Sequence, residues 1–424
     1  MVGVRAAGRD PGGAGPQYDA RLGGHPLMAG SASLWKIAPS VYLPALLYGI
    51  GQGAIAPVVA VSATHLGASV AAAGLVVAAA GLGQVIGDIP AGALTNKIGE
   101  RSAMILATGL VALALVACLL VPTAWGLAIA IAATGVAGAV WGLARQAYLS
   151  EAVPIQLRAR ALSTLGGVQR IGSFIGPFLG AFAMRFLGTD GAYWVHLVAA
   201  VLACGVLVSL PDIESVRRTR GSRPVAAQST WTVIREHMPV LRTLGVGALL
   251  VGAVRASRQV VIPLWALHIG LDPETTSIIF GLSGAVDMLL FYPAGSVMDR
   301  LGRKWVAVPS MFVLGLAHLL LPLTHSTVTL TAVALLMGVG NGLGAGVIMT
   351  LGADASPPVG RAQFLGAFRL FADTGNGAGP LLLAGATAVL GLGPAIVFMA
   401  ATGWAAAAAM HRWIPPHPTQ DQPV

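Results

Sequence analysis

The chain has 424 residues, of which 56% are hydrophobic and only 10% are charged, and its mean hydropathy is +0.78. Soluble proteins of this size carry roughly 25% charged residues, so water is not the main solvent of this chain. The formal net charge of +9 could suggest a nucleic-acid partner, but the basic residues lie in loops between apolar runs, which argues against it. The two cysteines, Cys118 and Cys204, both lie inside apolar runs, so neither a disulfide framework nor a metal site is expected.

Residues 1–36 are rich in Gly, Ala and Pro and lack the features of a signal peptide, so they are predicted to form a disordered cytoplasmic tail. Beyond them, long apolar windows recur, and each can cross a hydrocarbon core of about 30 Å as a helix. Continuous runs rather than alternating ones favour helices over a barrel. The predicted helices span residues 39–62, 71–95, 102–121, 124–149, 160–186, 191–210, 240–267, 275–298, 304–323, 327–352, 362–387 and 392–412.

Lys and Arg lie in alternate loops. The loops near residues 97–101, 158–160, 217–242, 300–304 and 361 are basic, whereas the loops between them carry almost no cations. This pattern predicts that both termini and all basic loops are cytoplasmic, in the plasma (inner) membrane. The basic excess is therefore a topology signal, and no nucleic-acid partner is predicted.

Two stretches 203 positions apart, PAGALTNKIGER (90–101) and PAGSVMDRLGRK (293–304), share one skeleton. The same offset places Glu151 on Asp354, Arg158 on Arg361, and Gly176 on Gly379. The chain is therefore predicted to be an all-α integral membrane protein, with twelve transmembrane helices in two pseudo-symmetric six-helix bundles. The bundles span residues 37–211 and 239–413, joined by a cytoplasmic linker at 212–238 and followed by a cytoplasmic tail at 414–424.

The sequence resembles the major facilitator superfamily over everything but the tails and the linker. Gly92, Lys97, Gly99 and Arg101 match the family's motif between helices 2 and 3, with Asn96 where the family usually has Asp. A Gly-Pro motif in the fifth predicted helix resembles that of the family's drug:proton antiporters, although the Arg usual near the start of helix 4 in those antiporters is absent. The residues of this motif and its repeat are Gly172, Gly176, Pro177, Gly180, Gly379 and Pro380.

The resemblance implies that the two basic turns act as a gate on the cytoplasmic side. Alternatively, the turns only fix the orientation of the chain in the membrane. Gly99 and Gly302 allow sharp reversals, and Gly92 and Gly295 are expected to let a neighbouring helix approach. We expect Arg101 to pair with Glu151, Arg303 to pair with Asp354, and Asp299 to brace a helix end of the opposite half. The candidate gating residues are Gly92, Asn96, Lys97, Gly99, Arg101, Glu151, Arg158, Gly295, Asp299, Arg300, Gly302, Arg303, Asp354 and Arg361.

Ionisable side chains inside predicted membrane helices cost about 2.5–3.5 kcal/mol each on insertion scales. Asp88 and Arg145 lie at similar depth and are predicted to brace helices 2 and 4. Arg369 and Asp373 are four residues apart on one helix and are predicted to pair. Arg170 and Asp373 are equivalent in the repeat, so they are also predicted to meet across the pseudo-twofold axis.

Asp287 is the first candidate for carrying a proton, because desolvation in an apolar helix favours the neutral carboxyl group. Asp88 and Asp373 compete for this role. Arg255 and Arg258 share a helix face, which indicates an anionic substrate or, alternatively, pairing with Asp287. The cavity candidates are Gln52, Gln84, Arg170, Arg255, Arg258, Asn341 and Asn376.

The sequence thus predicts a secondary transporter that works by alternating access as a monomer. Proton-coupled efflux of a small amphipathic molecule is the first prediction. Proton-coupled uptake, or uniport, of a small organic anion is the alternative. The sequence has no HExxH or GxSxG motif, so neither enzyme activity nor a cofactor or metal is predicted.

Overall fold

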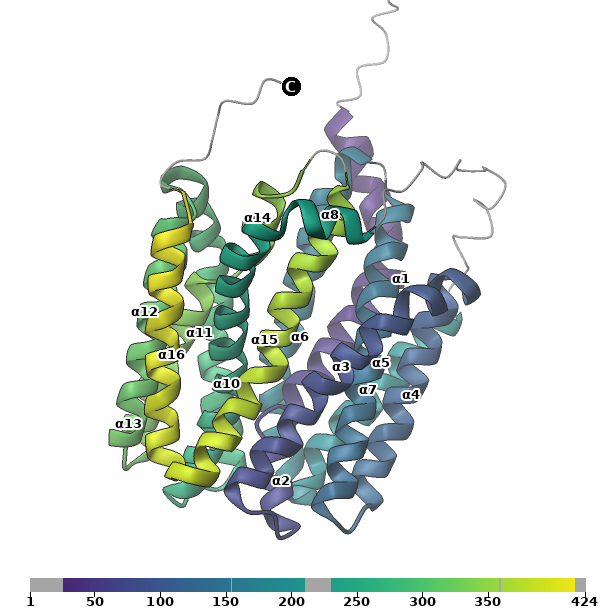
Figure 1. The fold of residues 1–424 in the computed structure, drawn as a ribbon. Coiled ribbons are helices and arrows are strands. Elements are labelled where there is room, and N and C mark those ends of the chain that lie inside the picture. Colours follow the sequence, from purple (N-terminus) through teal and green to yellow (C-terminus); the bar gives the residue numbers. More distant parts are fainter. Residues whose placement is uncertain (1–25, 154, 210–229, 358–359, 416–424) are drawn as a thin grey trace, which may run out of the picture.

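The computed structural model describes residues 26–153, 155–209, 230–357 and 360–415. Every regular element in this part of the chain is a helix (Figure 1). The first half contains α1 (Pro26–Ile55), α2 (Val59–His65), α3 (Val70–Ile98), α4 (Glu100–Leu120), α5 (Ala124–Ala152), α6 (Ile155–Leu187) and α7 (Asp190–Ser209). The second half contains α8 (Thr230–Glu236), α9 (Met238–Val240), a π-helix (Leu241–Gly245), α10 (Val246–His268), α11 (Pro273–Leu301), α12 (Lys304–Leu320), a 3₁₀ turn (Leu321–Leu323), α13 (Thr327–Leu343), α14 (Val347–Asp354), α15 (Arg361–Leu390) and α16 (Leu392–Trp413).

Each of the twelve predicted helices has a counterpart. The first is a pair, α1 and α2, bent by 41°, and the tenth is broken into α13 and α14 where Gly346 takes a left-handed φ of 85°. α1 begins at Pro26, earlier than predicted, whereas residues 1–25, 210–229 and 416–424 lie outside the described part. Nine described helices, or ten if the bent pair is one span, are long and apolar enough to cross a membrane.

The two halves repeat one packing scheme. In the first half α1 packs against α6 and α3 against α5, and in the second half α10 packs against α15 and α11 against α13. The halves meet through α3 with α15 and through α6 with α11 (Figure 1). This arrangement shows the two-fold repeat that the 203-residue offset predicted, and it is consistent with six helices in each bundle.

The Gly-Pro motifs hold helices together within each half. A Cβ atom on Gly176 of α6 would collide with the backbone carbonyl of Ile50 on α1, and one on Gly379 of α15 would collide with that of Ala253 on α10. Only glycine allows backbones to approach this closely. The motif that resembles an antiporter signature is therefore a packing device in both repeats.

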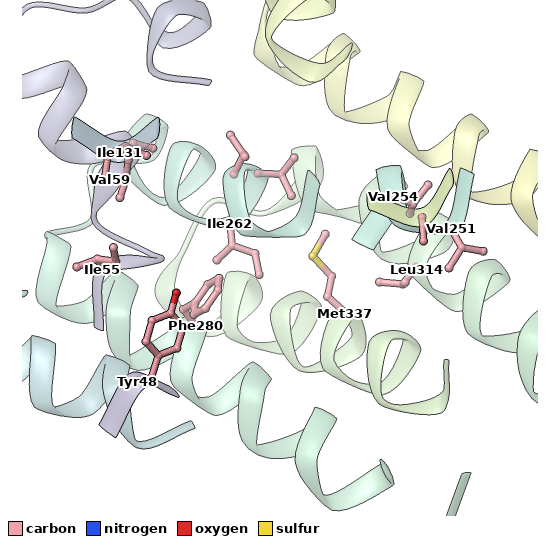
Figure 2. Close-up of a cluster of buried hydrophobic side chains, with 14 of the residues drawn as sticks. Tyr48, Ile55, Val59, Ile131, Val251, Val254, Ile262, Phe280, Leu314 and Met337 are labelled. Carbon is pink, nitrogen blue, oxygen red and sulfur yellow. The ribbon is translucent and has the colours of Figure 1, made fainter. Parts of the chain in front are cut away.

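Large apolar side chains lie both inside the bundles and on their outer surface. Figure 2 shows buried apolar side chains such as those of Ile262, Phe280 and Met337. Other apolar side chains, among them Ile89 and Leu113, are exposed. An exposed apolar surface of this extent fits contact with lipid tails rather than with water.

The two ends of the molecule differ. We call the end where α7 and α16 finish, and where α8 lies, the linker end (Figure 1). At the opposite end the halves are in contact: Gly74 packs on Ala384, Gly281 on Phe178, and Arg185 pairs with Glu274 at 3.5 Å. These contacts close the end opposite the linker.

Candidate functional site

A central cavity of about 690 Å³ lies between the halves. Its walls come mainly from α1, α3, α5 and α6 of the first half and α10, α11, α13 and α15 of the second. Its charged lining consists of Asp287 and five arginines, namely Arg145, Arg170, Arg255, Arg258 and Arg369. The described cavity wall thus has an excess of four positive charges, or three once Asp373, which pairs with Arg369, is counted.

All the cavity residues predicted from the sequence line this space: Gln52, Gln84, Arg170, Arg255, Arg258, Asn341 and Asn376. Asp287 does too. Sequence reasoning missed Arg145, Gln169, Gln259 and Arg369 as lining residues. Arg369 and Arg145 had been treated only as partners of carboxylates, although a guanidinium group in a membrane helix is itself a signal for a polar cavity.

Asp287 on α11 connects the two halves. Its Oδ1 lies 3.4 Å from Nη1 of Arg170 on α6, and the two side chains are 15% and 30% exposed. The guanidinium carbon of Arg170 also stands 4.6 Å from the centre of the Phe291 ring. The predicted meeting of Arg170 with Asp373 is wrong, because α6 packs against α11 while α15 packs against α3.

The second Asp287 oxygen joins a chain within the second half. Asn341 of α13 donates its Nδ2–H to Oδ2 of Asp287 at 2.7 Å. Nε–H of Arg255 donates to Oδ1 of the same Asn341 at 2.8 Å. Arg255 therefore reaches Asp287 through Asn341 and does not pair with it directly. The apolar surroundings assumed for Asp287 are absent, since cations and an amide face it.

Arg258 is the most enclosed of the cavity arginines. Its side chain is 7% exposed, and Nη1 donates to the Ser283 hydroxyl at 3.0 Å. Ser283 in turn donates to the Ala334 carbonyl at 2.5 Å. Nε of Arg258 has no hydrogen-bond partner among the described residues, which leaves a buried N–H donor of a cation unsatisfied at the wall of the cavity.

The predicted Asp88–Arg145 brace is not formed. Arg145 instead donates to Oε1 of Gln169 at 2.6 Å, from α5 to α6. Asp88 lies within electrostatic reach of Asp373 and Arg369 across the interface between halves. The predicted Arg369–Asp373 pair is confirmed, with a distance of 3.2 Å. Similar depth was thus a poor guide, because the rotation of each helix decides which side chains meet.

The family profile described as Major Facilitator Superfamily matches residues 41–257 and 244–424. The chain belongs to the Major Facilitator Superfamily. It is 19% identical over 322 residues to an uncharacterised MFS-type transporter of Methanocaldococcus jannaschii, and the match covers 75% of this chain and 83% of that relative. The protein is therefore a multi-pass membrane transporter of MFS type.

Solved structures agree on the fold. A bacterial homologue of the human lysosomal transporter Spinster, in an inward-facing and unoccupied conformation, matches with a TM-score of 0.74 and 14% identity, over 90% of this chain and 97% of that one. The human organic anion transporter MFSD10 matches with a TM-score of 0.64 and 16% identity, over 89% and 99%. At these identities the likeness shows a shared fold only.

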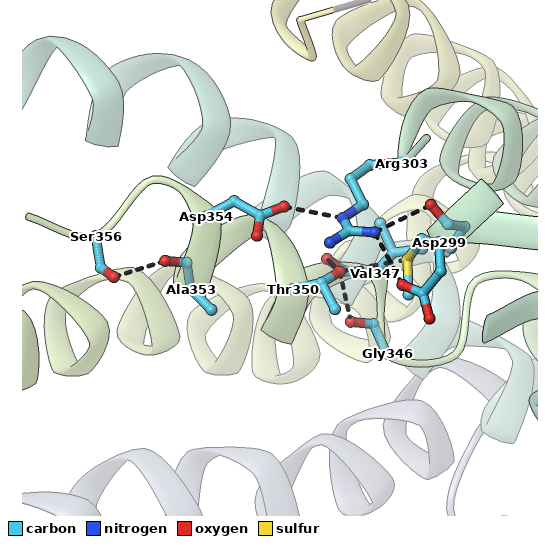
Figure 3. A network of polar contacts seen from close by, with 9 residues as sticks. Asp299, Arg303, Gly346, Val347, Thr350, Ala353, Asp354 and Ser356 are labelled. Carbon is cyan, nitrogen blue, oxygen red and sulfur yellow. Dashed lines mark hydrogen bonds and ion pairs between the residues drawn. The ribbon is translucent and has the colours of Figure 1, made fainter. Parts of the chain in front are cut away.

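The second basic turn of this MFS transporter forms a compact ion-pair network at the linker end (Figure 3). Arg303 donates to Oδ2 of Asp354 at 2.9 Å, to Oδ1 of Asp299 at 3.1 Å and to the Met298 carbonyl at 3.0 Å. The hydrogen bond to Asp354 raises the pKa of Arg303 above its ordinary value. The predicted Arg303–Asp354 pair is confirmed, whereas Asp299 braces its own half and not the opposite one.

The first basic turn is built differently. Arg101 donates to the Leu207 carbonyl at the end of α7, at 2.8 and 2.9 Å. The side chains of Glu151 and Arg158 lie outside the described residues, so the predicted Arg101–Glu151 pair stays a prediction. The turn glycines behave as predicted, with φ of 85° at Gly99 and 98° at Gly302.

Gly92 and Gly295 do not serve the predicted close approach. A Cβ atom on Gly92 would make only an ordinary contact, at 3.9 Å from Leu143, and one on Gly295 would meet open space. The remaining motif residues, Asn96, Lys97, Arg300 and Arg361, are exposed side chains. Exposed cations at a helix end suit the water–membrane boundary.

One buried polar pair lies behind the cavity wall. The Ser257 hydroxyl is 3.0 Å from Nε2 of His318, and Nδ1 of His318 is 2.8 Å from the Leu314 carbonyl. Both side chains are fully buried. A hydroxyl sealed from the cavity cannot reach a substrate, so this serine–histidine pair is a packing contact between α10 and α12.

Proposed function

We propose that this transporter carries small organic anions, which was the alternative in the sequence analysis, and not amphipathic drugs. The observation that supports this proposal is the cavity wall with five arginines and one aspartate. Guanidinium groups bind carboxylates and phosphates with two parallel hydrogen bonds. A cationic substrate would meet several positive charges and only one carboxylate, which already faces Arg170.

The uncharged part of the lining argues in the same direction. Beside the arginines, the cavity wall carries six amide side chains, from Gln52, Gln84, Gln169, Gln259, Asn341 and Asn376. These amides can hydrogen-bond a polar substrate. The same wall also carries Trp141, Phe174 and Phe280, so the excess of cations, and not a lack of apolar surface, is what weighs against an amphipathic cation.

Asp287 gives this site a route to proton coupling. Its carboxylate competes with a substrate anion for Arg170 directly and for Arg255 through Asn341. A proton on Asp287 would remove the competing charge and release both guanidinium groups. Proton and anion would then bind together and cross the membrane in the same direction, as in a symporter. Asp88 and Asp373 remain the other candidates for the proton.

The groups facing Asp287 support the proposal that Asp287 carries the proton. They are Arg170 from α6, Arg255 and Arg258 from α10, and the neutral Asn341 from α13. No second carboxylate lines the described cavity wall. Protonation of Asp287 therefore changes the charge of the site more directly than protonation of Asp88 or Asp373.

The direction of the molecule in the membrane is part of the proposal. The basic loops belong to the linker end, which we place in the cytoplasm of a plasma membrane by the excess of Lys and Arg. The closed end, with Arg185 and Glu274, then faces outward, which would make the described conformation an inward-facing one. Alternating access would require these outer contacts to separate while the linker end closes.

The test is transport by the purified protein in proteoliposomes with an imposed pH gradient. We expect inward movement of a carboxylate that is stimulated by an inward proton gradient, and its loss in Arg255→Gln. Arg242→Gln is the matched control, because Arg242 is an exposed cation just before α10 that does not line the cavity. Transport of amines but of no carboxylate or phosphate would overturn the proposal.

A further inference from the structure

The cavity holds a second set of binding groups besides its arginines. Gln84 on α3, Gln259 on α10 and Asn376 on α15 all line it. None of the three makes a side-chain hydrogen bond within the described part of the chain, although Gln52 donates to the Tyr48 hydroxyl and Gln169 accepts from Arg145. Three amides thus present both a free N–H donor and a free carbonyl acceptor to the cavity.

Unpaired amides in a membrane protein need a partner from outside the fold. A polar side chain within a membrane span is tolerated where it faces a water-filled cavity or a bound ligand that can hydrogen-bond it. Gln259 and Asn376 are exposed even though they lie within the spans of α10 and α15. Their side chains therefore open toward the cavity, where water or a bound ligand can satisfy them.

The spacing connects these amides to the arginines. Gln259 follows Arg255 by four residues on α10, so the two side chains share one face and are separated by about 6 Å along the helix. Gln84 lies one turn from Gly81, which packs against Gly377 beside Asn376. Gln84 and Asn376 therefore lie on facing helices of the two halves.

We propose that the transported anion is a hydroxylated organic acid, whose acid group binds the arginines and whose hydroxyl groups bind Gln84, Gln259 and Asn376. This inference rests on the proposed anion transport and names its substrate class. An amide matches a hydroxyl group well, because each can donate and accept at once. An ammonium group would need a free carboxylate, and the one in the described cavity wall, Asp287, is held by Arg170 and Asn341.

The experiment compares acids that differ only in hydroxyl groups. Dissociation constants would be measured by calorimetry on the purified transporter for three pairs: glycerate and propanoate, threonate and butanoate, gluconate and hexanoate. The hydroxylated member of at least one pair is expected to bind about tenfold more tightly, because it gains one or more hydrogen bonds that the plain acid cannot make. Gln84→Leu or Asn376→Leu should weaken it to the level of the plain acid and leave the plain acid unchanged.

Gln363→Leu is the matched control, because Gln363 lies on α15 with Asn376 but does not line the cavity. Melting temperature and gel filtration report whether each variant folds. Gln259→Leu provides a second test should a variant at the interface between halves misfold. Equal binding of both members in every pair, or a preference that survives removal of all three amides, would overturn the inference while the proposed anion transport stands. Failure of every carboxylate and of every organic phosphate to bind would overturn both.

Discussion

Asp287→Asn is the most informative single change, because it imitates a protonated Asp287 permanently. In the wild type a substrate carboxylate on the far side of Arg170 would lie roughly 6 Å from the Asp287 carboxylate. At an effective dielectric constant of about 20, two like charges at that distance repel by about 2.8 kcal/mol. Removing one of them should tighten anion binding by about 100-fold, or about tenfold if water in the cavity doubles the dielectric constant.

The proposed symport also predicts how anion binding depends on protons. Anion affinity in the wild type should rise as the pH is lowered, because the carried proton removes the charge that competes for Arg170. In Asp287→Asn the affinity should be high and nearly independent of pH. Calorimetric titration at several pH values measures both quantities, with Asp190→Asn as control, since Asp190 is an exposed carboxylate in the first turn of α7. Unchanged or weaker anion binding in Asp287→Asn would refute the competition between Asp287 and the substrate.

Three further predictions concern stability. Gly176→Ala should destabilise the protein by about 1–3 kcal/mol, because the new Cβ overpacks against Ile50. The control Gly167→Ala, where a Cβ meets open space, should not lower the melting temperature. Equal melting temperatures of the two variants would contradict the packing role of Gly176. Arg303→Gln and Asp354→Asn should be non-additive in a double-mutant cycle, with a coupling of about 0.2–1 kcal/mol for this partly exposed pair, and strict additivity would mean that the pair contributes nothing. Burial raises the pKa of Asp272, but the hydrogen bonds from Thr275 outweigh this effect and hold the pKa below its ordinary value. The stabilisation of α11 by the Asp272 cap is therefore present above the unfolded-state pKa of Asp272 and lost as pH falls through its folded-state pKa. Asp272→Ala should cost about 1 kcal/mol at neutral pH and nothing in acid; a difference from the wild type that is independent of pH would show that the ionised carboxylate is not what stabilises α11.

The sequence alone predicted the architecture because its repeat is long and exact in spacing. The 203-residue offset that aligns Gly176 with Gly379 corresponds to helix pairs, α1 with α6 and α10 with α15, that pack alike. It also predicted most of the polar cavity residues, though not Arg145, Gln169, Gln259 or Arg369, since a polar side chain at mid-span in a membrane helix is costly unless it faces a polar space. Both predictions depend on position along the chain, which a sequence shows directly.

Pairings were harder to predict. Arg170 meets Asp287 and Arg145 meets Gln169, although symmetry and depth had favoured Asp373 and Asp88. A pairing depends on the rotation of two helices about their own axes, which hydrophobicity does not fix when helices are apolar on all sides. The break between α13 and α14 at Gly346 was missed for a related reason, because a glycine in a glycine-rich run does not reveal which φ it adopts.

Recognition of carboxylates by the arginine-rich cavity can be tested in one binding experiment. The purified transporter would be titrated with a carboxylate, its carboxamide and the corresponding amine on each of the carbon skeletons used above. The carboxylate is expected to bind at least about tenfold more tightly than the carboxamide, which has nearly the same shape but no charge, and this advantage should disappear in Arg255→Gln. Tightest binding by the amine, or a carboxylate preference that survives both Arg255→Gln and Arg258→Gln, would contradict carboxylate recognition by these arginines.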